Sequence, residues 1–376
     1  MLVLTIFLTS LLVVAFSIPP IINLAFKKRL FDEPSEERKV HKRIVPNFGG
    51  VAIFTGFVFT SCLFISHELL PQASILMAAG LILFTIGLKD DMIGLSPLVK
   101  FVAQFTNAII VAVVADIRIE SLQGIMGFGQ LDYYVSVALT VIFIVGVVNA
   151  FNLIDGVDCL AASLGVMVSV IFACLFFEAN ELGWAYLSIC LCGALIGFLI
   201  FNVTPAKIFM GDSGSLVLGF IAVTLGVKYI QLADVRELHF SMLPITSTFG
   251  LVASILLIPI FDTLRVFTLR IVKGRSPFEA DSNHLHHRLL FLGFSHLQVT
   301  LILVLTNTVF VVMTLLCQSI GNGQLLSLLI LTSLSANGLL TLYIERYKAS
   351  LIKVRPEPTE DKRAFADQIL ESINKN

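Results

Sequence analysis

The chain has 376 residues, of which 57% are hydrophobic by a wide count and only 14% are charged. A soluble globular protein carries about 25% charged residues, so this composition excludes an ordinary soluble domain and indicates that most of the chain lies in lipid. The net charge of −1 points to neither an acidic nor a basic partner, and nothing in the sequence suggests nucleic acid.

Eleven segments are apolar enough to be membrane-spanning helices, each of which needs roughly 20 residues. They lie at approximately 2–25, 47–66, 70–88, 98–115, 134–153, 160–178, 183–201, 213–231, 242–262, 297–317 and 324–344. No basic residue precedes the first apolar run, and the first basic cluster, at 27–29, follows it. This order indicates an uncleaved first span with its N-terminus outside.

The basic residues test this topology. With the N-terminus outside, 22 of the 25 lysines and arginines fall on the cytoplasmic side, and only Arg118, Lys228 and Arg236 fall outside. Such a bias fixes orientation. We therefore predict an all-α, polytopic integral membrane protein of about eleven transmembrane helices, with its C-terminus cytoplasmic. Residues 1–344 are expected to form the transmembrane domain, and 345–376 a charged cytoplasmic tail.

Unusual polar residues collect on the predicted cytoplasmic face. The stretch NAFNLIDGVD at 149–158 ends a charge-free run, Asp90 and Asp91 are adjacent, and Asp212 and Asp262 lie at ends of spans. Ionisable residues at the membrane are usually functional. Hard oxygen ligands suit Mg²⁺, which takes one or two carboxylates, waters and substrate phosphates. The pattern predicts a shared site in which Mg²⁺ holds a diphosphate.

Each carboxylate also has a simpler interpretation. Asp212 starts a span and could be only its N-cap. Asp262 could pair with Arg265 one turn on. Asp155 and Asp158, three residues apart, would be neighbours on a helix and would repel each other without a cation.

The sequence HLHH at 284–287 has two interpretations. On a helix, His284 and His287 share a face and His286 points elsewhere. A zinc site is one alternative, but no HExxH motif or cysteine partner accompanies it. Nearby Lys273, Arg275 and Arg288 favour phosphate binding instead, and His286 alone could be structural. In the first inner loop, Lys42 belongs either to an ordinary positive-inside cluster or to an anion site.

Five motifs occur together in a characteristic order: VPNFGG at 45–50, GLKDD at 87–91, NAFNLIDGVD at 149–158, FNVTPAKIFMGDSGS at 201–215 and HLHH at 284–287. This set resembles the polyprenyl-phosphate N-acetylhexosamine-1-phosphate transferases of the glycosyltransferase 4 type. The resemblance implies a multi-pass enzyme of the bacterial cytoplasmic membrane with its site on the cytoplasmic face. It would transfer a sugar 1-phosphate from a UDP-N-acetylhexosamine to undecaprenyl phosphate, release UMP and initiate a lipid-linked glycan.

The resemblance also implies roles by position. The expected catalytic residues are Asp90 and Asp91. The expected metal ligands are Asp212 and Asp91, for Mg²⁺ with Mn²⁺ as the alternative ion. The expected substrate-binding residues are Asn152, Asp155, Asp158, His284, His286, His287, Lys42 and Asn202. N-acetylglucosamine is the default sugar, and a homodimer stays open.

Two positions depart from the family's pattern. An acidic pair that often continues as DDxxD has Gly94 at its fifth position, and NxxDGxDG ends here in Cys159 instead of glycine. If that turn needs a positive φ, the Cβ of Cys159 would strain it.

Two rival functions remain. One is a transferase that uses UDP-muramoyl-pentapeptide, although the loop KGRSPFEADSNHLHH at 273–287 looks more like the simple UDP-N-acetylhexosamine branch. The other is a transporter with an acidic cation-binding vestibule, which would need polar residues at mid-span and on the outer side. For the transferase, we favour direct attack of the lipid phosphate over a covalent route through Asp90 or Asp91.

Overall fold

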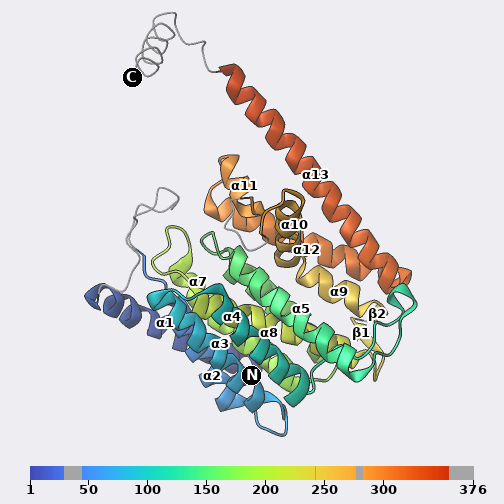
Figure 1. The fold of residues 1–376 in the computed structure, drawn as a ribbon. Coiled ribbons are helices and arrows are strands. Elements are labelled where there is room, and N and C mark those ends of the chain that lie inside the picture. The colour runs from blue at the N-terminus through green and yellow to red at the C-terminus, as the bar shows by residue number, and fades with distance from the viewer. Residues whose placement is uncertain (29–44, 242, 277–282, 355–376) are drawn as a thin grey trace, which may run out of the picture. The chain divides into compact units, whose positions relative to one another are not determined.

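A computed structural model describes residues 1–28, 45–241, 243–276 and 283–354, with side chains as far as Ser350. The chain divides into two compact units, Met1–Ile330 and Leu331–Asn376. The elements, drawn in Figure 1, are α1 (Leu2–Lys28), α2 (Gly49–Phe64), α3 (Ala73–Ile93), α4 (Pro97–Ile109), η1 (Ile110–Val114), η2 (Ile125–Gly127), α5 (Tyr133–Ile154), α6 (Leu160–Glu178), α7 (Leu182–Asn202), α8 (Asp212–Leu232), β1 (Leu238–Phe240), β2 (Leu243–Ile245), α9 (Thr248–Ile255), α10 (Leu257–Val272), α11 (Leu285–Phe291), α12 (His296–Leu316), η3 (Gln318–Ile320) and α13 (Asn322–Val354).

The described residues form nine helices long and apolar enough to cross a membrane. The bent pair α9–α10 is a candidate tenth, and α2 is a shorter apolar helix of 16 residues. The chain is thus a helical, multi-pass membrane protein, as its composition predicted. The count of eleven, the orientation of the termini and the division at 344 stay predictions.

One predicted span, 242–262, is wrong in its bounds and shape. The short antiparallel strands β1 and β2 pair Leu238 with Ile245, so the segment begins as a hairpin. Helices α9 and α10 follow, bent by 79° at Leu256. Pro259 explains the break, because a proline cannot donate the helical hydrogen bond to the carbonyl four residues earlier.

The break is stabilised by Asn307 of α12. Its amide nitrogen donates to the carbonyls of Ser254 at 3.0 Å and Ile255 at 3.2 Å, and its oxygen accepts the N–H of Ile258 at 3.0 Å. A main-chain polar group that is buried in an apolar interior without a hydrogen bond destabilises the fold by roughly several kcal/mol. A buried asparagine in an otherwise apolar helix therefore holds the bend of its neighbour.

Helix α8 is almost entirely buried, and it packs against α2, α3, α5, α6 and α9 (Figure 1). Its first residues are approached closely by two glycines. A Cβ on Gly87 of α3 would lie 2.6 Å from the main chain of Ser213, and one on Gly50 of α2 would overlap Gly214. The absence of a Cβ at Gly50 and Gly87 therefore permits this close helix packing. These contacts bring the ends of α2 and α3 onto the start of α8.

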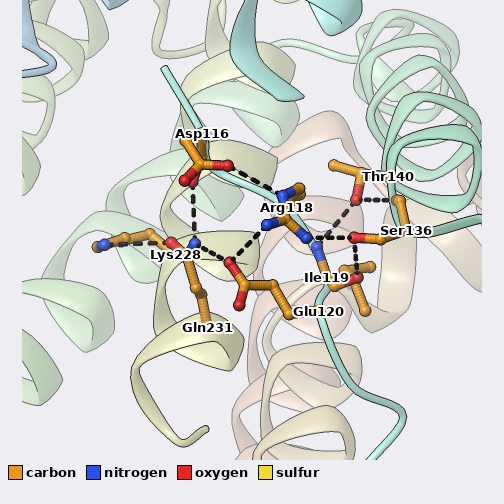
Figure 2. Close-up of polar contacts among 8 residues, drawn as sticks. All are labelled: Asp116, Arg118, Ile119, Glu120, Ser136, Thr140, Lys228 and Gln231. Carbon is orange, nitrogen blue, oxygen red and sulfur yellow. Dashed lines mark hydrogen bonds and ion pairs between the residues drawn. The ribbon is translucent and has the colours of Figure 1, made fainter. Parts of the chain in front are cut away.

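The opposite end of α8 carries a separate polar network, shown in Figure 2. Arg118 binds Asp116 at 2.9 Å and Ser136 at 3.2 Å, and Glu120 at 3.5 Å. The amide nitrogen of Gln231 donates to Glu120 at 2.8 Å, and Lys228 donates to Gln231 at 3.1 Å. Two of the three basic residues predicted outside thus gather here, among partners supplied by the protein itself; Arg236, the third, pairs with Glu181.

Candidate active site

A cavity of about 270 Å³ lies where α3 and α5 end and α8 begins. It is lined by Asn47, Asp91, Asn152, Asp155, Gly156, Val157, Asp158, Asn202, Phe209, Met210, Gly211 and Asp212. Six of these were predicted from the sequence as site residues: Asp91, Asn152, Asp155, Asp158, Asn202 and Asp212. The loops predicted to share one site therefore do meet.

Asp91 caps the N-terminus of α8. Its two carboxylate oxygens accept the main-chain N–H groups of Asp212 at 2.7 Å and Ser213 at 3.0 Å. The first N–H groups of a helix have no partner within it, and a carboxylate there also interacts favourably with the helix dipole. Asp212 is therefore not the cap of α8, contrary to the simpler interpretation of that residue. Its side chain is left to act elsewhere.

Lys100 of α4 bridges Asp90 and Asp212. Its Nζ atom lies 2.6 Å from a carboxylate oxygen of each, and the other oxygen of Asp90 accepts the N–H of Leu95 at 2.7 Å. The adjacent carboxylates Asp90 and Asp91 thus turn to different partners, one to a lysine and one to a helix terminus. Lys100 was counted among the cytoplasmic charges but was not predicted to be a site residue.

A polar face on α4 could have identified Lys100. Lys100, Gln104 and Asn107 recur at the spacing of one helical face within an apolar helix. Gln104 and Asn149 of α5 exchange side-chain amide hydrogen bonds at 3.2 and 2.6 Å. Asn107 donates to the carbonyl of Ala79 at 2.7 Å. These bonds fix α4 between α3 and α5, with Lys100 at the cavity end.

Asp155 lies among three other carboxylates. The helix α5 ends at Ile154, so the prediction that Asp155 and Asp158 are neighbours on a helix is wrong; both belong to a loop. Burial, followed by the charges of Asp212, Asp91 and Asp158, raises the pKa of Asp155 well above its ordinary value. A carboxylate in such a position favours either a proton or a cation.

The loop that contains Asp158 is held by Asn202. The Asn202 oxygen accepts the N–H of Cys159 at 2.8 Å, and its nitrogen donates to the carbonyl of Ile208 at 2.8 Å. Cys159 has φ of +70°, so the turn does adopt the left-handed conformation in which its Cβ is strained. Asp158 accepts the N–H of Ala206 at 3.3 Å. Asn202, predicted to bind substrate, thus ties two of the cavity's loops together.

The histidines lie beside this loop. His284 precedes α11 instead of sharing a helical face with His287, so that prediction is wrong. The rings of His284 and His286 stack 5.6 Å apart, and His286 and His287 are 4.3 Å apart. A Cβ on Gly156 would lie 2.5 Å from Nε2 of His286. This ring therefore rests directly on the loop of residues 155–159, which we call the cavity loop. Burial, then the charge of His287, lowers the pKa of His286 to about 3.

Asp262 anchors the segment of residues 284–287, which we call the histidine segment. One carboxylate oxygen lies 2.9 Å from Nδ1 of His284, and the other accepts the N–H of Leu285 at 2.9 Å. Arg265 donates to Asp262 at 3.0 Å, which confirms the predicted pair. Asp262 therefore positions a site element without lining the cavity.

One further predicted residue, Asn152, contacts the start of α8. Asn152 donates to the hydroxyl of Ser215 at 3.0 Å and so contacts the first turn of α8. Lys42 lies outside the described residues. Asn47, which the sequence did not single out, also lines the cavity.

The comparisons with known proteins agree with this arrangement. The glycosyl transferase family 4 model matches residues 73–230. The probable undecaprenyl-phosphate N-acetylglucosaminyl 1-phosphate transferase of Bacillus subtilis is 34% identical over 316 residues, 83% of this chain and 84% of that protein. The decaprenyl-phosphate N-acetylglucosaminephosphotransferase of Mycobacterium tuberculosis is 35% identical over 79% of this chain and 78% of its own. The undecaprenyl-phosphate alpha-N-acetylglucosaminyl 1-phosphate transferase of Salmonella typhi is 30% identical over 76% of each. With its motifs gathered around one cavity and this extent of likeness, the chain belongs to glycosyl transferase family 4, among the polyprenyl-phosphate N-acetylglucosamine-1-phosphate transferases.

Proposed function

We propose that the protein transfers N-acetylglucosamine 1-phosphate from UDP-N-acetylglucosamine to undecaprenyl phosphate and releases UMP. The observation that carries this proposal is the cavity itself, because it joins carboxylates and amides at the ends of membrane helices, and the His286 ring rests on one of its loops. A water-soluble nucleotide sugar and a lipid-tethered phosphate can both reach such a place. The names of the relatives supply the sugar and the polyprenyl acceptor.

The carboxylates fit Mg²⁺. Asp155 and Asp212 offer hard oxygen donors, and after burial it is the charge of Asp212 that most raises the pKa of Asp155. The described residues contain no group of three or more His, Cys, Asp or Glu placed to hold a metal. Mg²⁺ commonly uses only one or two carboxylates with waters and phosphates, so two suffice. When bound, it would offset charge on the diphosphate and the leaving UMP.

Asp155 replaces Asp91 in this proposal as the second metal ligand. Both oxygens of Asp91 already accept main-chain N–H groups of α8. Asp91 instead orients Asp212, because it fixes the first turn of α8, to which Asp212 belongs. Lys100 holds Asp212 from the other side and supplies a positive charge for the phosphates once substrate enters.

Direct attack by the lipid phosphate suits these contacts better than a covalent route. A covalent intermediate needs a carboxylate oxygen that can reach phosphorus, whereas both oxygens of Asp90 and of Asp91 are engaged by Lys100, Leu95 or the start of α8. A phosphate monoester has a second pKa of about 6 and is largely a dianion at neutral pH. It therefore needs little help from a general base.

The cavity is proposed to face the cytoplasm, in the bacterial inner membrane. The excess of basic residues in the loops near the cavity supports this orientation. The polar residues at the opposite end of α8 are bound to one another, which gives no support to a transport path.

The test is UMP release by protein in detergent, supplied with undecaprenyl phosphate and a panel of UDP-sugars. Release needs no sealed membrane, which distinguishes the enzyme from a transporter. Competition by UDP-muramoyl-pentapeptide tests the other transferase branch. Asp212→Asn is expected to abolish release, and Asp132→Asn is the matched control, since Asp132 caps α5 outside the cavity and asparagine caps equally well. Undiminished release by Asp212→Asn would defeat the metal assignment.

A further inference from the structure

The first two turns of α12 contact one residue of the cavity loop through two side chains. Nδ1 of His296 accepts the main-chain N–H of Asp158 at 3.3 Å. One turn later, the hydroxyl of Thr300 donates to the carbonyl of Asp158 at 3.1 Å. Residues four apart lie on the same face of a helix. One helix face thus holds both main-chain polar groups of Asp158, and we call His296 and Thr300 the Asp158 clamp.

The clamp sits on a rigid support. Ser295 and Gln298 form a capping box at the start of α12, with the Gln298 oxygen accepting the N–H of Ser295 at 2.9 Å. Such reciprocal bonds fix the first turn of a helix. Thr300 is buried, and the His296 side chain is only 12% exposed. The positions of both side chains are therefore defined by the packing of α12.

The loop needs such support because it is not held by regular structure. It lies between the end of α5 and the start of α6, and its last residue, Cys159, has a positive φ. Asn202 binds the N–H of Cys159, and Ala206 binds the Asp158 carboxylate. The clamp adds contacts from an element far along the chain, so α12 helps to fix the main chain at Asp158, three residues after Asp155.

We propose that His296 and Thr300 are positioning residues that hold the Asp155–Asp158 loop in the conformation that binds the nucleotide sugar. The inference rests on the proposed function and extends it to α12, which none of the five sequence motifs reaches. The clamp acts on the donor side of the reaction only. It follows that loss of the clamp weakens binding of UDP-N-acetylglucosamine without affecting undecaprenyl phosphate.

His296 also lies 3.4 Å from the Asp158 carboxylate through the same Nδ1 atom. Both contacts involve Nδ1, whereas a histidine that touched the substrate would use Nε2. Asparagine places a polar atom near the position of Nδ1, and glutamine places one near that of Nε2. The pair His296→Asn and His296→Gln therefore separates the two roles.

The experiment measures KM for each substrate and kcat by UMP release, together with UDP-N-acetylglucosamine binding by calorimetry and the thermal midpoint. Relative to the wild type, His296→Ala, His296→Gln and Thr300→Val are expected to raise the donor KM and Kd about fivefold, the scale of one hydrogen bond. His296→Asn and Thr300→Ser should stay within about twofold. Leu301→Ala, at an exposed position of the same helix, is the control.

The outcomes separate the possibilities. Rescue by His296→Gln but not His296→Asn would replace the clamp with a direct substrate contact. Equal changes in both KM values, together with a lowered thermal midpoint, would show that His296 and Thr300 have only a structural role. Unchanged donor binding in His296→Ala would overturn the proposal. A wild type that binds the donor but releases no UMP would defeat the proposed transfer and leave the clamp to be judged by calorimetry.

Discussion

The Nζ atom of Lys100 lies 2.6 Å from the carboxylate of Asp212, and the same atom lies equally close to Asp90. Without this lysine, the two carboxylates would face each other across a half-buried site. We expect Lys100→Met, which keeps the stem and removes the charge, to lower kcat for UMP release about a hundredfold, the effect of losing one preorganised charged donor.

The control for this variant is Lys89→Met. Lys89 is exposed on the preceding helix, so its loss removes the same charge from the same neighbourhood without touching either carboxylate. Full activity in Lys100→Met would show that Asp90 and Asp212 act without a cationic partner.

Asp91 is predicted to affect stability as well as transfer. Because its carboxylate accepts two N–H groups at the start of α8, Asp91→Ala should lower the free energy of unfolding by about 1–2 kcal/mol, the usual cost of losing a helix cap. Asp91→Asn keeps one acceptor oxygen and should lose less. It should bind UDP-N-acetylglucosamine and stall transfer. Calorimetry that finds donor binding lost in Asp91→Asn would instead make Asp91 a ligand of the nucleotide or its metal.

The sequence predicted which loops meet but not how they bind one another. Paired carboxylates at the ends of apolar spans indicated a shared site, since such groups are costly in a membrane unless they have partners. The partners themselves were not predictable. Asp91 binds main-chain amides 121 residues away, and those amides leave no mark in the sequence. Lys100 resembled any basic residue near a membrane surface. The bend at Leu256, where Pro259 breaks the helix, is stabilised by Asn307, a single polar residue in a distant helix.

Gly156 is predicted to be essential for the contact between the histidine segment and the cavity loop. A Cβ at this position would lie 2.5 Å from the His286 ring, so Gly156→Ala should displace one of them. Overpacking of this kind costs about 1–3 kcal/mol, and we expect a raised donor KM. Gly146→Ala is the matched control, because nothing lies within 4 Å of the Cβ it would add.

A double variant sharpens this test. In Gly156→Ala combined with His286→Ala, the clash is absent. The changes in the free energy of unfolding caused by the two single variants should therefore not add up to the change in the double variant. Strict additivity would mean that the ring and the loop do not touch.

His286 is predicted to make stability depend on pH. Its pKa in the folded protein is lowered to about 3 from an ordinary value of 6.5, so the folded state resists protonation more than the unfolded state does. The stability associated with neutral His286 is complete above pH 6.5 and is lost as the pH falls from 6.5 toward 3. The limiting slope is about 1.4 kcal/mol per pH unit. His286→Asn should flatten the acid side of the unfolding curve, and an unchanged slope would contradict the buried neutral ring.

Cys159 is predicted to carry backbone strain that glycine would relieve. At its φ of +70°, a residue with a Cβ costs roughly 1 kcal/mol more than glycine. We therefore expect Cys159→Gly to exceed Cys159→Ala in free energy of unfolding by about that amount. Both variants remove the sulfur that lies 3.3 Å from the Asn202 carbonyl, so their difference isolates the backbone. Cys174, exposed within α6, provides the control. At this helical position the glycine variant is expected to be about 1 kcal/mol less stable than the alanine variant. The sign of the glycine–alanine difference should thus reverse between the two cysteines, and the same sign at both would mean that the turn at Cys159 is unstrained.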